Sequence, residues 1–263
     1  MKIGWLADNP PYKGGAELCA AELLANAPSY VEIVPMAANA VHNNVDAFVI
    51  HNCTEYGSFI IPILETKPVI KYVHDVWPHG DPILKKWLGM KSALMVLSSP
   101  LHRQSLNMDI SCPTAYVPNA INLNRYYQAD ANGTHVLDTC WVGRFHPDKG
   151  LENAAAWAKR NNRVIDWYGN GMPLPEHFGG NYCGKLMPEQ VADTMAKYRT
   201  FVFLPDEVEP FSRVVVEAWA AGCEVVTNGN VGAVWWIETR PNDLARGAEM
   251  FWACVRDSVA VGV

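Results

Sequence analysis

The sequence predicts an α/β protein with two parallel-sheet domains. Its 263 residues exceed the usual size of one domain. Short apolar, β-branched runs alternate with helical patterns, which is typical of parallel strands covered on both faces. This alternation pauses at the polar, turn-rich segment 126–133 and then restarts. We therefore expect an N-terminal domain over 1–130 and a C-terminal domain over 131–263, with the final helix free to pack back on the first domain.

The first half contains six runs that are typical of buried strands. They lie at 2–7, 31–35, 46–51, 69–74, 93–98 and 114–118. Helical patterns separate some of them, at 15–27, 82–90 and 100–107.

The second half repeats the same alternation. Candidate strands lie at 136–142, 163–168, 200–204 and 224–227, and candidate helices at 150–161, 188–198, 212–221 and 242–257. Ligands of such sheets bind beyond the carboxyl ends of the strands, so we expect the two domains to face one another across a ligand cleft.

Composition excludes several classes of protein. No stretch approaches the roughly 20 apolar residues of a membrane span, and no basic amphipathic helix indicates a membrane surface. A net charge of −6 argues against a broadly basic nucleic-acid surface. Seven separate cysteines without a CxxC pair argue against disulfides or zinc and favour the cytoplasm, with peripheral membrane attachment left open. No partner protein can be read from the sequence.

Two cations follow the first strand of the second half. Arg144 and Lys149 lie between a strand that we expect to end at Gly143 and a helix that begins near Gly150. Both could reach one diphosphate, Arg144 bidentately and Lys149 as a point charge. The alternative is a solvated loop whose charges bind nothing.

A second chemical segment follows the strand at 200–204. Glu209 and Glu217 flank a helix start at Pro210, where the backbone N–H groups of Phe211, Ser212 and Arg213 could hold an anion. Both carboxylates could accept hydrogen bonds from the hydroxyls of one ligand. Alternatively, Glu209 complements the helix dipole and Glu217 is solvated.

Taken together and in order, these segments resemble the GT-B glycosyltransferases of the retaining GT4-type family. The motifs concerned are Gly143-Arg144…Lys149-Gly150, Tyr168-Gly169-Asn170-Gly171, Glu209-Pro210-Phe211-Ser212…Glu217-Ala218-Trp219-Ala220-Ala221-Gly222, Gly14-Gly15-Ala16-Glu17, His74-Asp75 and Val117-Pro118-Asn119-Ala120-Ile121-Asn122. Ser212 departs from the glycine that is usual at its position. Trp235 and Trp236 lie where the family often has an acidic residue.

The resemblance implies two Rossmann-like domains and transfer of a sugar from a nucleotide-diphosphate donor to an acceptor hydroxyl, with retention. It gives catalytic roles to His74, Arg144, Lys149 and Glu209. It gives donor contacts to Gly15, Gly143, Gly169, Lys185, Leu186, Phe211, Ser212, Arg213 and Glu217. For His74, a buried core histidine is the alternative.

The implied enzyme needs no cofactor and no metal, since the sequence has no D-x-D motif and no histidine pair at ligand spacing. We expect a UDP-sugar as donor, with GDP- and ADP-sugars as alternatives. The acceptor is not identified: a saccharide or glycolipid is the default, and a modified nucleic-acid base is an alternative. Competing functions are a sugar-nucleotide epimerase or hydrolase on the same scaffold, and a non-catalytic protein that binds sugar nucleotides.

Overall fold

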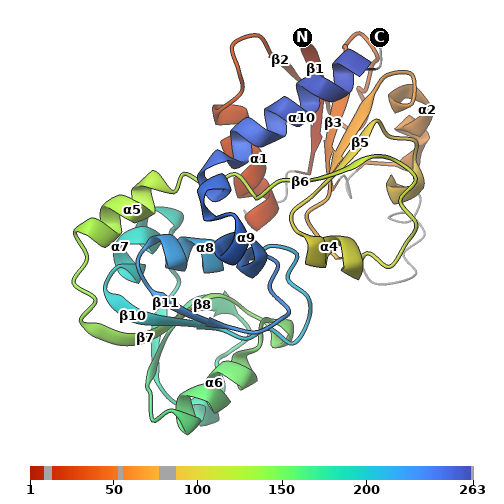
Figure 1. The fold of residues 1–263 in the computed structure, drawn as a ribbon. Coiled ribbons are helices and arrows are strands. Elements are labelled where there is room, and N and C mark those ends of the chain that lie inside the picture. The colour runs from red at the N-terminus through yellow and green to blue at the C-terminus, as the bar shows by residue number, and fades with distance from the viewer. Residues whose placement is uncertain (9–13, 53–55, 77–86, 262–263) are drawn as a thin grey trace. The chain divides into compact units, whose positions relative to one another are not determined.

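The computed structural model describes residues 1–8, 14–52, 56–76 and 87–261. The chain forms two compact units, one of Met1–Ile121 with Thr239–Val263 and one of Asn122–Glu238. Each unit has its own parallel sheet, which confirms the predicted α/β class (Figure 1). By this division, 122–130 belongs to unit 2 and the final helix to unit 1.

The sheet of unit 1 has six strands in the order β2-β1-β3-β4-β5-β6, all paired in parallel. These are β1 (Lys2–Ala7), β2 (Glu32–Pro35), β3 (Ala47–His51), β4 (Val69–Tyr72), β5 (Leu94–Leu97) and β6 (Thr114–Tyr116). Every residue of β3, β4 and β5 is buried. This is the burial that helices on both faces of a parallel sheet produce.

The helices of unit 1 come from the first 121 residues and from the C-terminal segment of the chain. They are α1 (Gly15–Ala25), the 3₁₀ turn η1 (Ser58–Ile60), α2 (Ile61–Leu64), α4 (Pro100–Ser105), the 3₁₀ segment η5 (Pro241–Arg246) and α10 (Gly247–Val261). Helix α10 lies beside α1, where Phe251 and Trp252 join the core and the Trp252 indole donates to the Leu23 carbonyl (3.0 Å) (Figure 1). The helix expected at 82–90 falls largely outside the described residues.

The sheet of unit 2 has five parallel strands in the order β11-β10-β7-β8-β9. They are β7 (Leu137–Phe145), β8 (Ile165–Gly171), β9 (Asn181–Gly184), β10 (Tyr198–Phe203) and β11 (Glu224–Thr227). The helical elements are α5 (Asn124–Ala131), η2 (Pro147–Lys149), α6 (Leu151–Arg160), η3 (Glu176–Phe178), η4 (Pro188–Gln190), α7 (Val191–Met195), α8 (Arg213–Ala220) and α9 (Ala233–Thr239). Trp141, Trp167 and Phe201 are fully buried in its core.

Two α-helices and one strand of unit 2 were not predicted from the sequence: α5, α9 and β9. Helix α5 replaces the expected turn-rich connection because Leu123, Tyr126 and Ala129, spaced by three, bury one face. It contacts α7 and α8, which explains why it belongs to unit 2. The expected helix 188–198 is shorter, since Tyr198 already begins β10.

Candidate functional site

Most of the predicted residues of unit 2 lie at or after the carboxyl ends of β7 and β10. We expected strand β7 to end at Gly143. It continues through Arg144 to Phe145, because β8 extends beside it. Arg144 is exposed. A short 3₁₀ turn then places Lys149 directly before Gly150, whose φ of 68° lies in the left-handed region. A Cβ on Gly150 would lie 1.8 Å from the Leu204 carbonyl oxygen, so only glycine fits between the two loops.

Lys149 and Glu209 form an ion pair across these two loops. They are 60 positions apart in sequence, and their side chains are largely buried, with exposed fractions of 24% and 17%. The backbone of Glu209 is fixed as well: its N–H donates to the Asn230 carbonyl (2.7 Å), and its carbonyl accepts from Gly232 (2.9 Å). The predicted phosphate-binding cation thus touches the predicted sugar-binding carboxylate.

The segment after Glu209 turns sharply into α8. Phe211 is buried at 2% exposure and anchors the turn, while Ser212 has φ 68° and ψ 85° and is the N-cap residue of the helix. Glycine adopts this left-handed conformation without penalty, which gives a physical reason for the usual glycine at this position. The strained backbone of Ser212 lies directly before the first turn of α8, whose N–H groups have no partner within the helix.

Arg213 and Glu217 form an i, i+4 ion pair of 3.4 Å in which each side chain is only 11% exposed. Glu217 also accepts a hydrogen bond from Tyr126 of α5, and burial together with this carboxylate raises the pKa of the Tyr126 hydroxyl. The sequence did not point to Tyr126, because the helix that carries it was not predicted. Glu217 is thus a buried, doubly partnered carboxylate rather than a solvated one.

The remaining predicted residues of unit 2 lie on β8 and after β9. Gly169 lies within β8, where a Cβ would come within 2.1 Å of the Gly143 carbonyl oxygen. Lys185 is exposed and Leu186 is half-buried. In the described part of the chain, Lys185 makes no hydrogen bond or ion pair.

In unit 1, the predicted residues lie at the carboxyl edge of the first sheet. Gly15 is the first residue of α1, where the Glu17 carboxylate accepts from the Gly14 N–H (2.7 Å). His74 is buried at 8% exposure, two residues after β4. Its Nε2 lies 2.9 Å from Nδ1 of His51, the last residue of β3.

His51 was not predicted to be a site residue, although its position carried a signal. Both histidines close neighbouring parallel strands, and such strands end at the same edge of a sheet. Burial lowers the pKa of His51 to about 3, so its ring is neutral at neutral pH.

Asn52 and His102 bond to the His74-Asp75 segment, and Ser98 contacts His102 in turn. Asn52, in the left-handed region with φ 48°, accepts from the His74 N–H (3.2 Å) and donates to the Asp75 carboxylate (2.5 Å). The His102 Nε2 donates to the Asp75 carbonyl (3.2 Å), and the Ser98 hydroxyl contacts the other ring nitrogen (3.0 Å). Burial, opposed by the Asp75 carbonyl, lowers the pKa of His102 to about 4.

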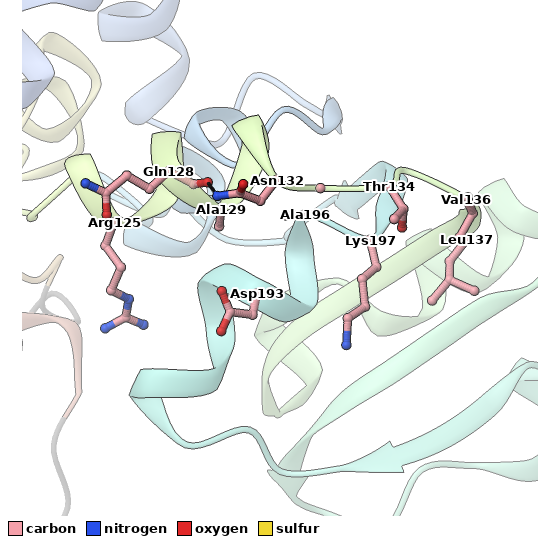
Figure 2. A pocket seen from close by; sticks show the side chains of 11 residues that line it. Arg125, Gln128, Ala129, Asn132, Thr134, Val136, Leu137, Asp193, Ala196 and Lys197 are labelled. Atoms are coloured by element: carbon pink, nitrogen blue, oxygen red, sulfur yellow. Dashed lines mark hydrogen bonds between the residues drawn. The ribbon is translucent and has the colours of Figure 1, made fainter.

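Two surface hollows lie on unit 2, at opposite edges of its sheet. One of about 530 Å³ lies at the carboxyl end of β8, between Asn170 and Tyr182, and Asn170 pairs in register with Arg144. The larger, of about 670 Å³, lies at the amino ends of β7 and β10. In Figure 2, Arg125 and Lys197 extend into it with Asp193 between them, and it contains none of the predicted site residues.

Two features are absent from the described residues. No cluster of three or more His, Cys, Asp or Glu side chains has the arrangement to hold a metal ion. None of the described helices is both long enough and apolar enough to cross a membrane.

Comparison with known proteins identifies the fold. No known family and no curated protein matches the sequence. Among solved structures, Anabaena HepE in complex with UDP and glucose matches with a TM-score of 0.66 and 15% identity, over 100% of this chain and 93% of that one. AviGT4, a glycosyltransferase involved in avilamycin A biosynthesis, matches with a TM-score of 0.66 and 18% identity, over 94% and 88%.

A third solved structure extends this likeness. The sucrose-phosphate synthase of Thermosynechococcus elongatus matches with a TM-score of 0.67 and 14% identity, over 99% of this chain and 94% of that one. Each of the three covers nearly the whole chain, including both sheets. The chain therefore has the GT-B glycosyltransferase fold.

Proposed function

We propose that the chain is a glycosyltransferase that moves a sugar from a nucleoside-diphosphate sugar to an acceptor hydroxyl, with retention at the anomeric carbon and without a metal ion. The observation that carries this proposal is the ion pair between Lys149 and Glu209. It joins a cation suited to a diphosphate to a carboxylate suited to sugar hydroxyls, at the edge of the sheet where α/β folds bind ligands.

The reaction needs stabilisation of the leaving group. The bond between the anomeric carbon and the diphosphate breaks, the acceptor oxygen forms the new bond on the same face, and the leaving phosphate takes the acceptor's proton. Negative charge grows on the diphosphate, where Arg144, Lys149 and the first-turn N–H groups of α8 stabilise it. Arg144 supplies the bidentate contact, since its exposed guanidinium makes no ion pair within the described residues.

The two carboxylates bind hydroxyls of the donor, and the other residues take the roles that the family resemblance implies. Glu209 binds hydroxyls of the transferred sugar, and Glu217 binds those of the ribose. Lys185 and Leu186 contact the nucleobase, while Gly15 contacts the diphosphate and His74 the sugar. A UDP-sugar is favoured because the similar HepE structure contains UDP and glucose. Six described cysteines are free thiols, which supports a cytoplasmic location.

A thermal-shift titration tests the donor site. We would compare UDP, GDP, ADP and their glucose conjugates, since a ligand raises stability in proportion to the logarithm of its concentration over Kd. We expect UDP and UDP-glucose to raise the Tm most. Arg144→Ala should weaken UDP binding roughly 10- to 100-fold, the value of a charge-assisted hydrogen bond.

Arg160→Ala is the matched control, because Arg160 is an exposed arginine of the same unit at the end of α6. It removes the same charge and should leave UDP binding unchanged. If no nucleotide raises the Tm of the wild-type protein, or if both variants bind UDP equally well, the proposed donor site is wrong. Proton NMR of the product formed from UDP-glucose and a test saccharide would show whether the configuration is retained.

A further inference from the structure

A histidine lies between the two cations of the proposed donor site. His146 follows β7 directly, two residues after Arg144 and three before Lys149. It is the N-cap residue of the short turn η2, where its carbonyl accepts a hydrogen bond from the Lys149 N–H (3.1 Å). The proposed mechanism gives this histidine no role, although it belongs to the loop that carries both cations.

The side chains of Arg144 and His146 point to the same side of the sheet. The backbone of His146 is extended, with φ −148° and ψ 145°, so it continues the strand geometry in which every second residue shares a face. Phe145, between them, is buried at 3% exposure on the opposite face, where its ring lies 5.5 Å from that of Trp141. Arg144 and His146 are both exposed.

The side to which they point is the one that carries α8. The Trp141 ring lies 5.9 Å from Trp167, whose own ring lies 5.9 Å from Phe178 of η3, and η3 lies against α6. In Figure 1, α6 covers one face of this sheet and α8 covers the other. Arg144 and His146 therefore extend toward the face of α8, whose first-turn N–H groups belong to the proposed diphosphate site.

Asp148 binds one nitrogen of the His146 ring. The Nδ1 of His146 and the Asp148 carboxylate form a hydrogen bond within the loop. An ionised carboxylate only accepts hydrogen bonds, so Nδ1 carries a proton in both the neutral and the charged ring. Asp148 is fixed in turn, because its carbonyl accepts from the N–H of Asp206 in the loop after β10 (3.2 Å). This carboxylate thus sets the tautomer of the ring.

The other nitrogen of the ring is available to a ligand. The His146 side chain is 51% exposed, and its Nε2 makes no hydrogen bond or ion pair with any residue that the structure describes. With Nδ1 protonated, a neutral ring has an acceptor lone pair at Nε2, whereas a charged ring has an N–H there. The oxygens of a diphosphate are acceptors, so only the charged ring can donate to them.

We propose that protonated His146 is a third cationic contact of the donor diphosphate, made through its Nε2–H, and that Asp148 is the positioning residue that holds the ring. The inference rests on the proposed function, in which Arg144 and Lys149 bind the same diphosphate. The proton on His146 comes from solvent and stays on the ring, and the acceptor's proton still goes to the leaving phosphate. Donor binding then depends on pH, because histidine is the side chain that changes charge between about pH 5 and 8.

Other charged groups surround the loop, from the same turn and from the elements beside it. They are Arg144 of β7, Asp148 and Lys149 of η2, Glu152 of α6, and Asp206 and Glu209 after β10. Lys149 is paired with Glu209, and the Asp206 carboxylate accepts from Asn153 of α6 (2.8 Å). The substitution His146→Gln leaves all of these groups in place, so it separates the contribution of the histidine from theirs.

The test is the affinity of the full chain for UDP-glucose between pH 5.5 and 8.5, measured by isothermal titration calorimetry at constant ionic strength. UDP-glucose replaces UDP because a terminal phosphate itself titrates near pH 6. We expect the wild-type affinity to fall about tenfold from the acidic to the alkaline end, the lower end for a charge-assisted hydrogen bond, since His146 is half exposed. His146→Gln should bind at every pH as weakly as the wild type binds at pH 8.5.

Asp148→Asn tests the positioning role. The amide keeps the shape of the side chain but stabilises a charged ring less than a carboxylate does, so the fall in affinity should begin at lower pH than in the wild type. A merely structural role of Asp148 would instead lower the affinity equally at every pH.

His177→Gln is the matched control. His177 is another exposed histidine of unit 2 beside a carboxylate, with its Nε2 3.7 Å from Glu152. This variant should keep the wild-type profile. Far-UV circular dichroism would establish that each variant is folded.

Three results would overturn the role of His146 while leaving the donor site intact, since UDP-glucose binds in each. They are a wild-type affinity that does not change with pH, a His146→Gln profile as steep as that of the wild type, and a His177→Gln profile as flat as that expected for His146→Gln. Failure of the wild type to bind UDP-glucose at any pH contradicts the proposed function, and the role of His146 falls with it.

Discussion

The buried ion pair between Arg213 and Glu217 leads to a quantitative prediction about stability. An i, i+4 pair on a helix surface contributes only about 0.3–0.5 kcal/mol. Here each side chain is only 11% exposed, and Glu217 has a second partner in Tyr126. Removing one partner leaves the other charge buried, which typically costs about 3–5 kcal/mol. Because some exposure remains, we expect Glu217→Ala and Arg213→Ala each to cost about 3 kcal/mol, at the lower end of that range.

A double-mutant cycle distinguishes the buried pair from a surface pair. The double variant removes both charges together, so its loss of unfolding free energy should be smaller than the two single losses combined, by about 2 kcal/mol. The measurement is urea unfolding of all four proteins near pH 7, followed by tryptophan fluorescence. Glu217→Gln keeps the shape and an acceptor for Tyr126, and should cost less than Glu217→Ala. Single losses below about 1 kcal/mol and a coupling near 0.5 kcal/mol would refute this account.

Three other changes should alter stability. The pKa values of His51 and His102 are lowered to about 3 and 4, so the unfolded chain binds protons that the folded chain does not as pH falls below 6.5. Each histidine should therefore lower the unfolding free energy by up to about 1.4 kcal/mol per pH unit between pH 6 and 5, and His51→Asn should remove its share of the slope in urea titrations. Gly150→Ala should cost at least about 2 kcal/mol in the same assay, because its Cβ meets the Leu204 carbonyl in a left-handed conformation. Ser212→Gly should instead raise the Tm: relief of about 1–2 kcal/mol of left-handed strain exceeds the roughly 0.5–1 kcal/mol entropic cost of glycine.

Apolar runs predicted the buried strands well, and polar or glycine-rich strands poorly. The first strand, β1, has the expected bounds, since the four residues after Lys2 are buried between two neighbouring strands. Strand β9 is exposed at a sheet edge and has no alternating pattern, so periodicity could not reveal it. Gly143 and Gly169 are typical of turns, yet both lie within strands. At Gly169 the missing side chain lets β8 approach the Gly143 carbonyl oxygen, and at Gly143 it leaves room for the Trp141 ring, two contacts that no local pattern contains.

The candidate site shows the same limit. Family-like motifs located Lys149 and Glu209. Their mutual contact arises because the strands that precede their two loops, β7 and β10, are neighbours in the sheet. Tyr126 was missed because its helix was not predicted, and His51 because its contact with His74 appears only when β3 and β4 pair. A motif identifies residues that bind a ligand directly; the residues that orient them are found from packing.

The Lys149–Glu209 pair also constrains how the proposed site changes on binding. Without a ligand, each charge is the partner of the other, which lowers the cost of keeping both largely buried. A donor would offer Lys149 a diphosphate and Glu209 a set of hydroxyls, so each group would exchange a charged partner for one on the ligand. Glu209 gives up a cation for neutral donors, whereas Lys149 gains a more highly charged anion. The gain at the diphosphate must therefore exceed the loss at the sugar, which makes the nucleotide the main source of affinity and leaves the sugar contact to set geometry.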